Sequence, residues 1–332
     1  MLRNLKGSSA NFIASAVWQQ AEANHVFVLN DREEAAYFHN DLESLTNALD
    51  ICFFPDSFKK SGEYRHLNSS HIMLRTEALA KLGNSSTFSN NREAIKKALV
   101  TYPEALFEKV VNATALSSNM IHIKTSEILK VDELMKRFVS LGFKREDFVY
   151  EPGQFAMRGG ILDIYSFGNE HPYRIELFGN EVDSIRIFNP ETQLSERKLL
   201  QVSILPNIET KFESQEKISL LDYLPPNTVF WFKDLTFTIE KLAKAEDDLT
   251  EKLPEGSVAA IEQDEQIIKQ LTPEDFEQID SWKRKLLDRH IIQWTENSVD
   301  SDVVSKDVTF IDFGTENQPV FNRNFELLIA NL

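Results

Sequence analysis

The sequence of 332 residues contains little cysteine and no long apolar run. Its single cysteine, Cys52, excludes an internal disulfide, and the surrounding stretch DICFF is typical of a small core residue. No apolar run approaches the roughly 18–20 residues that span a bilayer, and the N-terminal MLRNLKGSSANF lacks the apolar region of a signal peptide. The content of 42% hydrophobic and 27% charged residues is that of an ordinary globular protein. We therefore expect a cytoplasmic protein that makes no membrane contact.

Basic residues are also scarce. The formal net charge is −16, and residues 207–332 contain 13 basic and 26 acidic side chains. Nucleic-acid binding depends on cationic side chains that neutralise phosphates, so this last third of the chain should repel DNA. The simpler interpretation of these charges is a solvated acidic surface.

No complete catalytic or metal-binding motif is present. The seven histidines never fall in an H-x-x-x-H spacing, no G-x-S-x-G segment occurs, and Cys52 has no basic partner nearby in the sequence. We predict that this chain binds no metal and no cofactor and has no catalytic residue.

The N-terminal segment NLKGSSANF resembles a phosphate-binding loop that has lost its functional groups. A working loop reads G-x-x-x-x-G-K-[ST], in which the lysine reaches the phosphates and the hydroxyl holds Mg²⁺. With Gly7 in the middle of the loop, Asn4 and Ser9 replace the two glycines, Ala10 replaces the lysine and Asn11 replaces the hydroxyl residue. An ordinary loop before a helix could have the same appearance. In either case we expect no ATP binding or hydrolysis.

Hydrophobic periodicity predicts alternating helices and strands in the first and last parts of the chain. Helices are expected over 11–23, 31–49, 71–83, 131–142, 235–253 and 273–293, and strands over 25–30, 50–54, 98–102, 121–125, 229–234 and 308–314. Asp31 is expected to cap the second of these helices, with Glu34 in capping-box position.

The region from about residue 148 to 188 differs, because its strands are separated by hairpin-length turns. The expected fold is therefore α/β: a P-loop-like parallel sheet with helices on both faces, built discontinuously from residues 1–118 and 208–332. Residues 119–207 form a small inserted α+β domain with an antiparallel sheet.

Within this region, YRIELFGNEVDSIRIF reads as two strands that turn at Gly179-Asn180. Because side chains alternate between faces, Ile175 and Leu177 should point into the core. The opposite face should carry Arg174, Glu176, Phe178, Arg186 and Phe188. Either another element such as helix 131–142 covers the aromatic residues, or this face binds a protein, since arginine and aromatic residues are enriched in interface hot spots. Arg158 precedes an open Gly159-Gly160 backbone at the start of the same sheet.

The segment YEPGQFAMRGGILDIYSFGNEHPYRIELFGNEVDSIRIFNPETQ resembles one shared by the excision-repair protein UvrB and the N-terminal region of the transcription-repair coupling factors (Mfd). FFPDSF and FNRNFELL extend the resemblance. The incomplete phosphate loop favours the Mfd family over UvrB. Asp234 also favours the Mfd family, because it lies where an acidic box would stand but has no adjacent glutamate. The absence of a long tyrosine-rich hairpin favours the same family.

The resemblance implies domains 1a (1–118), 2 (119–207) and 1b (208–332), with UvrA as the partner of domain 2. The residues that match the family's UvrA contacts are Arg158, Arg174 and Phe178, with Glu176, Arg186 and Gly159 as further candidates. It implies a non-catalytic module that recruits UvrA for nucleotide excision repair and is masked in the resting protein. RNA polymerase, double-stranded DNA and ATP would be bound by an ATP-dependent translocase beyond this chain. The alternative is a UvrB-type ATP-dependent enzyme that binds damaged DNA.

Overall fold

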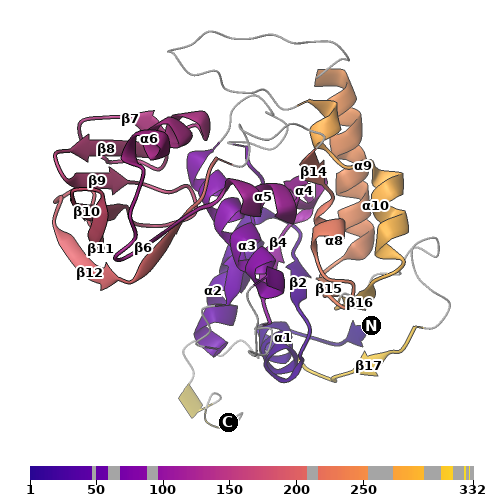
Figure 1. Cartoon of the computed structure of the whole chain (residues 1–332). Coiled ribbons are helices and arrows are strands. Elements are labelled where there is room, and N and C mark those ends of the chain that lie inside the picture. The colour runs from indigo at the N-terminus through magenta and orange to yellow at the C-terminus, as the bar shows by residue number, and fades with distance from the viewer. Residues whose placement is uncertain are drawn as a thin grey trace.

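The computed structural model describes residues 1–46, 50–58, 68–87, 96–207, 216–252, 272–294, 308–316, 325–326 and 329. The end of the predicted helix 31–49 and nearly all of the FNRNFELL segment lie outside the described residues. Figure 1 shows a sheet of inserted strands beside α2 (Arg32–Thr46) and α3 (Ser69–Thr87), with α9 (Leu235–Lys252) and α10 (Ile279–Leu286) on the opposite side of the molecule.

The α/β part is built on five parallel strands in the order β16-β15-β2-β4-β3. Their bounds are β2 His25–Val28, β3 Ile51–Phe53, β4 Ala98–Thr101, β15 Val229–Phe232 and β16 His290–Gln293. Apart from the edge strand β16, these strands consist mainly of buried apolar residues, which is the pattern of a parallel sheet covered on both faces. The predicted α/β class is confirmed.

The other α-helices that the structure describes in this part are α1 Ser9–Gln20, α4 Pro103–Phe107, α5 Ala113–Asn119 and α8 Leu220–Tyr223. The predicted cap of α2 is present, because the Glu34 amide donates to Asp31 Oδ1 over 2.9 Å. The Glu34 carboxylate accepts from the Asn30 amide, one residue before the cap. A short antiparallel pair, β5 (Val110–Val111) with β14 (Lys217–Ile218), joins the two halves of the α/β part.

The expectation of one helix over 273–293 is wrong. This segment contains a 3₁₀ turn (Pro273–Asp275), α10 and then β16, which pairs in parallel with β15. The charged stretch before β16 has helical spacing, but Ile291 and Ile292 pack against the core next to β15. The predicted strand over 308–314 is shorter, because β17 (Ile311–Asp312) pairs only with β1 (Leu2–Arg3), outside the five-stranded sheet.

The inserted sheet has six strands in the order β12-β11-β10-β9-β8-β7, antiparallel except for the parallel edge pair β7–β8. Their bounds are β7 Lys144–Arg145, β8 Gln154–Arg158, β9 Ile161–Ile164, β10 Tyr173–Phe178, β11 Glu181–Phe188 and β12 Ser195–Leu199. The pair β6 (Ile121–Lys124) with β13 (Gln201–Ile204) connects this sheet to the α/β part. Helix α6 (Val131–Ser140) packs on the inner face through the fully buried Phe138.

The hairpin β10–β11 turns at Gly179-Asn180 as predicted, with Gly179 at a φ of +64°. The pairing shifts by one residue between Glu176 and Leu177. This bulge places both Val182 and Ile185 in the core, although strict alternation would put them on opposite faces.

For Phe188, the alternative that another element covers the aromatic ring is the one observed, although helix 131–142 is not that element. Phe188 is fully buried and forms a small second core with Val149, Ala156 and Tyr165 on the side of the sheet away from α6. The loops before β8 and after β11 meet over this core, where the Gln193 side-chain amide donates to the Val149 carbonyl over 3.1 Å. Two loops that are distant in sequence therefore cover the ring.

Candidate protein-docking surface

The side of the six-stranded sheet that faces away from α6 is called the outer face here. Strand register places Arg186, Arg174, Asp163 and Ala156 in one row across β11, β10, β9 and β8. The neighbouring row consists of Ser184, Glu176, Ile161 and Arg158. The sequence-predicted residues thus come from three strands and lie side by side.

A buried carboxylate occupies the centre of the outer face. Asp163 has no exposed surface. Its Oδ1 accepts from Arg174 Nε over 2.7 Å, and its Oδ2 accepts from Arg174 Nη2 over 2.9 Å. Arg158 Nη2 donates to the same Oδ2 over 2.5 Å. A carboxylate with one bidentate and one single arginine partner is strongly bound and geometrically fixed.

Each arginine is also held by an aromatic ring and a loop carbonyl. The Arg158 guanidinium lies 4.4 Å from the Phe148 ring centroid and donates to the Asp147 carbonyl over 2.7 Å. The Arg174 guanidinium lies 4.4 Å from the Phe188 centroid and donates to the Gln193 carbonyl over 2.9 Å. Stacking on a ring adds a cation–π attraction to the hydrogen bonds.

The two arginines differ in how much of them a partner could reach. The Arg174 side chain is 14% exposed and that of Arg158 is 34% exposed. The hydrogen bonds to Asp163 raise the pKa of the Arg174 guanidinium further above its already high value. Arg174 is therefore largely part of the frame of the outer face, and Arg158 is the more available of the two cations.

Phe178, at the end of β10, is 84% exposed. Helix α6 packs on the inner face and does not cover it. Within the described chain, the interpretation that helix 131–142 buries this ring is therefore wrong for Phe178. An aromatic ring on solvent carries apolar surface that burial in a partner would remove from water.

The further candidates have weaker or indirect roles. Glu176 accepts from Ser184 Oγ over 2.7 Å and from Arg186 Nη2 over 3.4 Å, which makes a half-exposed polar cluster. Gly159 has a φ of +59° in the two-residue turn Gly159-Gly160 and has no side chain to offer a partner.

Three residues of the outer face were not predicted from the sequence: Asp163, Phe148 and Ile161. The alternation in GGILDI could have indicated that Asp163 points outward between the core residues Leu162 and Ile164. Ile161 lies between Arg158 and Glu176 and is 36% exposed. Phe148 lies in a loop, where no periodic signal exists.

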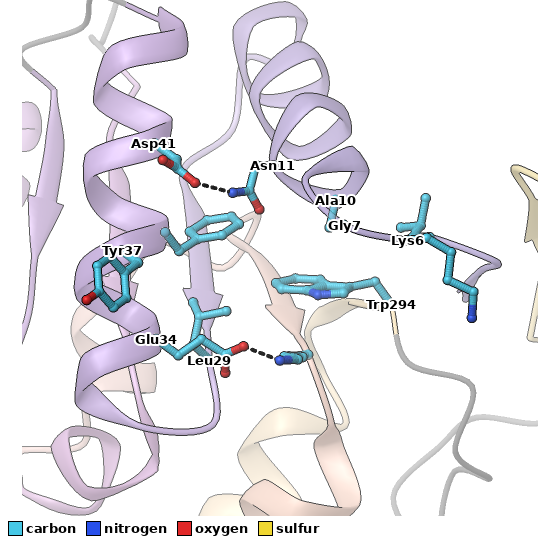
Figure 2. Close-up of a pocket in the computed structure, with 12 residues that line it drawn as sticks. Lys6, Gly7, Ala10, Asn11, Leu29, Glu34, Tyr37, Asp41 and Trp294 are labelled. Atoms are coloured by element: carbon cyan, nitrogen blue, oxygen red, sulfur yellow. Dashed lines mark hydrogen bonds and ion pairs between the residues drawn. The ribbon is translucent and has the colours of Figure 1, made fainter. Parts of the chain in front are cut away.

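The N-terminal loop borders a cavity of about 570 Å³ (Figure 2). The cavity lies at the carboxyl ends of β2, β15 and β16, because the residues that directly follow these strands, Leu29, Lys233 and Trp294, line it. This edge is where open α/β sheets bind ligands. Gly7, with a φ of +56°, and Ala10 line the cavity beside the start of α1.

Polar side chains in the cavity are bonded to one another. Asn11 donates to Asp41 over 2.6 Å, and Lys233 forms an ion pair with Glu34 (Figure 2). The hydroxyl of Ser9 donates to the Lys6 carbonyl over 2.7 Å and so closes the turn before α1.

Asp234, at the position of the expected acidic box, caps a helix. Its Oδ1 accepts from the Phe237 amide over 3.0 Å at the start of α9. The described ranges also contain no helix with the length and apolarity of a membrane span, and no three candidate metal ligands that lie together.

Comparison with known proteins assigns the inserted sheet to a domain class. Residues 121–209 match the UvrB interaction domain. The chain is 28% identical over 223 residues to the transcription-repair-coupling factor of Bacillus subtilis (strain 168), a match that covers 67% of this chain and 18% of the relative. The corresponding protein of Staphylococcus haemolyticus is 41% identical over 205 residues, covering 61% of this chain and 17% of the relative. That of Haemophilus influenzae is 28% identical over 203 residues, covering 61% and 17%.

The chain therefore contains a UvrB interaction domain, and it spans less than a fifth of the length of these curated relatives. It is homologous to the N-terminal region of the transcription-repair-coupling factors.

The geometry of the outer face predicts unequal effects of two substitutions on stability. Arg174→Ala should lower the free energy of unfolding by about 2–3 kcal/mol, less than the roughly 3–5 kcal/mol of a fully broken buried pair, because Asp163 keeps Arg158. Phe178→Ala should change it by less than about 0.5 kcal/mol, because the ring is exposed. Urea unfolding followed by circular dichroism measures both values, and an Arg174→Ala variant as stable as the wild type would contradict the ion-pair geometry.

Proposed function

We propose that this chain is a non-catalytic interaction module that recruits UvrA to lesion-stalled transcription complexes for nucleotide excision repair. The observation that carries the proposal is the exposed Phe178 ring on the same sheet as a fixed arginine pair, inside a UvrB interaction domain. Arg158, Arg174 and Phe178 are the proposed contacts, with Glu176, Arg186 and Gly159 at their margin.

Physical arguments support this assignment of contacts. Aromatic and arginine residues supply most binding energy when a partner desolvates them. Groups that are already rigid lose less conformational entropy on binding, and Arg158 is fixed by a carboxylate, a carbonyl and a ring. The outer face therefore combines an apolar anchor with a prepositioned cation.

In this proposal residues 119–207 carry the docking domain, and residues 1–118 with 208–332 form a cytoplasmic α/β platform. RNA polymerase, double-stranded DNA and ATP are bound by other parts of the longer protein, which acts as a DNA translocase. The chemistry of the N-terminal cavity supports the absence of a nucleotide site, because Ala10 offers no charge and Asn11 is engaged by Asp41.

The first test is the affinity of purified UvrA for the chain. Phe178→Ala and Arg158→Ala should each weaken binding by about 30- to 1000-fold, the effect of losing an anchor worth about 2–4 kcal/mol. Phe12→Ala is the matched control, because Phe12 is an exposed phenylalanine on α1 of the α/β part. It should leave the affinity unchanged.

Surface plasmon resonance on immobilised UvrA measures these affinities. If Phe178→Ala binds as tightly as Phe12→Ala, the assignment of the docking residues is wrong. If the wild-type chain does not bind UvrA, the proposed function itself is wrong.

A second test separates this proposal from a UvrB-type ATP-dependent enzyme. Calorimetric titration with Mg²⁺-ATP should show no saturable binding up to about 1 mM, because no lysine occupies position 10 to reach the phosphates. Saturable binding at micromolar concentrations would instead support the enzyme.

A third test concerns masking of the docking surface in the longer protein. If another domain covers the outer face at rest, the isolated chain should bind UvrA at least about tenfold more tightly than the whole protein, a difference of about 1.4 kcal/mol. Parallel titrations of chain and whole protein measure this ratio, and equal affinities would argue against masking.

A further inference from the structure

The outer face contains a group, Asp163, that is not among the proposed contacts. Asp163 lies on β9, the strand between those that carry Arg158 and Arg174. It accepts hydrogen bonds from both guanidinium groups, although it is itself fully buried. Because no part of its surface is accessible, a docking protein cannot touch it.

A buried carboxylate on a sheet is costly unless cations neutralise it. Because Asp163 is buried, Arg158 and Arg174 must lie within hydrogen-bond distance of its carboxylate. Arg174 uses Nε and Nη2 on Asp163 and Nη1 on the Gln193 carbonyl, and little of its side chain is exposed. Its donors are directed into the domain.

Arg158 is arranged differently. One Nη donates to Asp163 and the other to the Asp147 carbonyl. A guanidinium has five N–H donors, so Arg158 has donors beyond the two used in these bonds, and 34% of its side chain is exposed. Phe148 packs against one side of the guanidinium plane and limits its rotation.

We propose that Asp163 is the positioning residue of the docking surface, holding Arg158 so that its remaining donors face a carboxylate of the partner. This inference rests on the proposed function for the identity of the partner, but the positioning itself is a property of the chain alone. Asp163 acts on binding only through Arg158, because the donors of Arg174 are directed into the domain.

The first experiment needs no partner and no substitution. Side-chain ¹⁵N relaxation of the wild-type chain should give Arg158 an Nε–H order parameter near the roughly 0.85 of rigid groups. Arg145 is the control, because it is an exposed arginine of β7 in the same sheet. Its order parameter should fall below about 0.6. Equal mobility of Arg158 and Arg145 would overturn the positioning role.

The second experiment is a double-mutant cycle on UvrA affinity. Asp163→Asn, which preserves shape and removes the charge, should weaken binding by about tenfold, and Arg158→Gln by about 30-fold or more. The double variant should bind as Arg158→Gln does, to within about threefold, because the other arginine on Asp163, Arg174, directs its donors into the domain. Multiplicative losses would overturn the proposal, since they would mean that Asp163 acts by another route.

Asp183→Asn is the matched control for charge removal, because Asp183 is an exposed aspartate on β11 of the same sheet. It should leave both the affinity and the Arg158 order parameter unchanged, and a loss equal to that of Asp163→Asn would overturn the specific role of Asp163. If Asp163→Asn does not fold, the wild-type order parameters decide the question. If the wild-type chain does not bind UvrA, the proposed function fails, and the same order parameters still decide whether Asp163 fixes Arg158.

Discussion

The shape of the outer face depends on the neutralisation of one buried charge. Asp163 is removed from water on the middle strand of the sheet, where an unpaired carboxylate would be strongly destabilising. Arg158 and Arg174 meet that requirement from the two neighbouring strands. Their other donors bind the carbonyls of Asp147 and Gln193, so the same charge also fixes the two loops that cover the second core. The ion pairs of Asp163 therefore link three strands and, through the two arginines, two loops.

The two faces of this sheet differ, because the inner face is packed against α6 and the outer face leaves an aromatic ring in water. The inner face is buried against α6 through Phe138 and a continuous apolar cluster, which holds the strands in place. The outer face is stiffened by the ion pairs and leaves Phe178 in water at the tip of the hairpin. A flexible segment would lose backbone conformational entropy on docking, whereas the backbone of a paired hairpin has already lost it during folding.

Features that depend on local interactions were predictable from the sequence, and features that depend on residues distant in the sequence were not. The Gly179-Asn180 turn and the shared face of Arg174, Glu176 and Phe178 depend only on strand period and turn chemistry, which are local. The burial of Phe188 was not predictable in this way, because the loop after β11 covers it together with the loop that contains Val149, which lies far earlier in the sequence. The strand β16 was missed for a related reason, since its pairing with β15 spans some sixty residues of chain. The exposure of Arg174 was overestimated because alternation gives a side chain's direction but not its partners.

The α/β part has a cavity where sheets of this kind bind ligands, and polar groups of its lining are bonded to one another. The cavity lies at the carboxyl edge of the parallel sheet, and a helix begins beside it, as a phosphate site would require. Its charged groups, however, are paired internally, Lys233 with Glu34 and Asp41 with Asn11. The strand before the loop pairs with β17 and so is not in the sheet that a phosphate loop would extend. Lys6 and Lys233 line this cavity, and a polyphosphate that used Lys233 would have to break its ion pair with Glu34. These pairs support the proposal that the α/β part is a platform for residues 119–207.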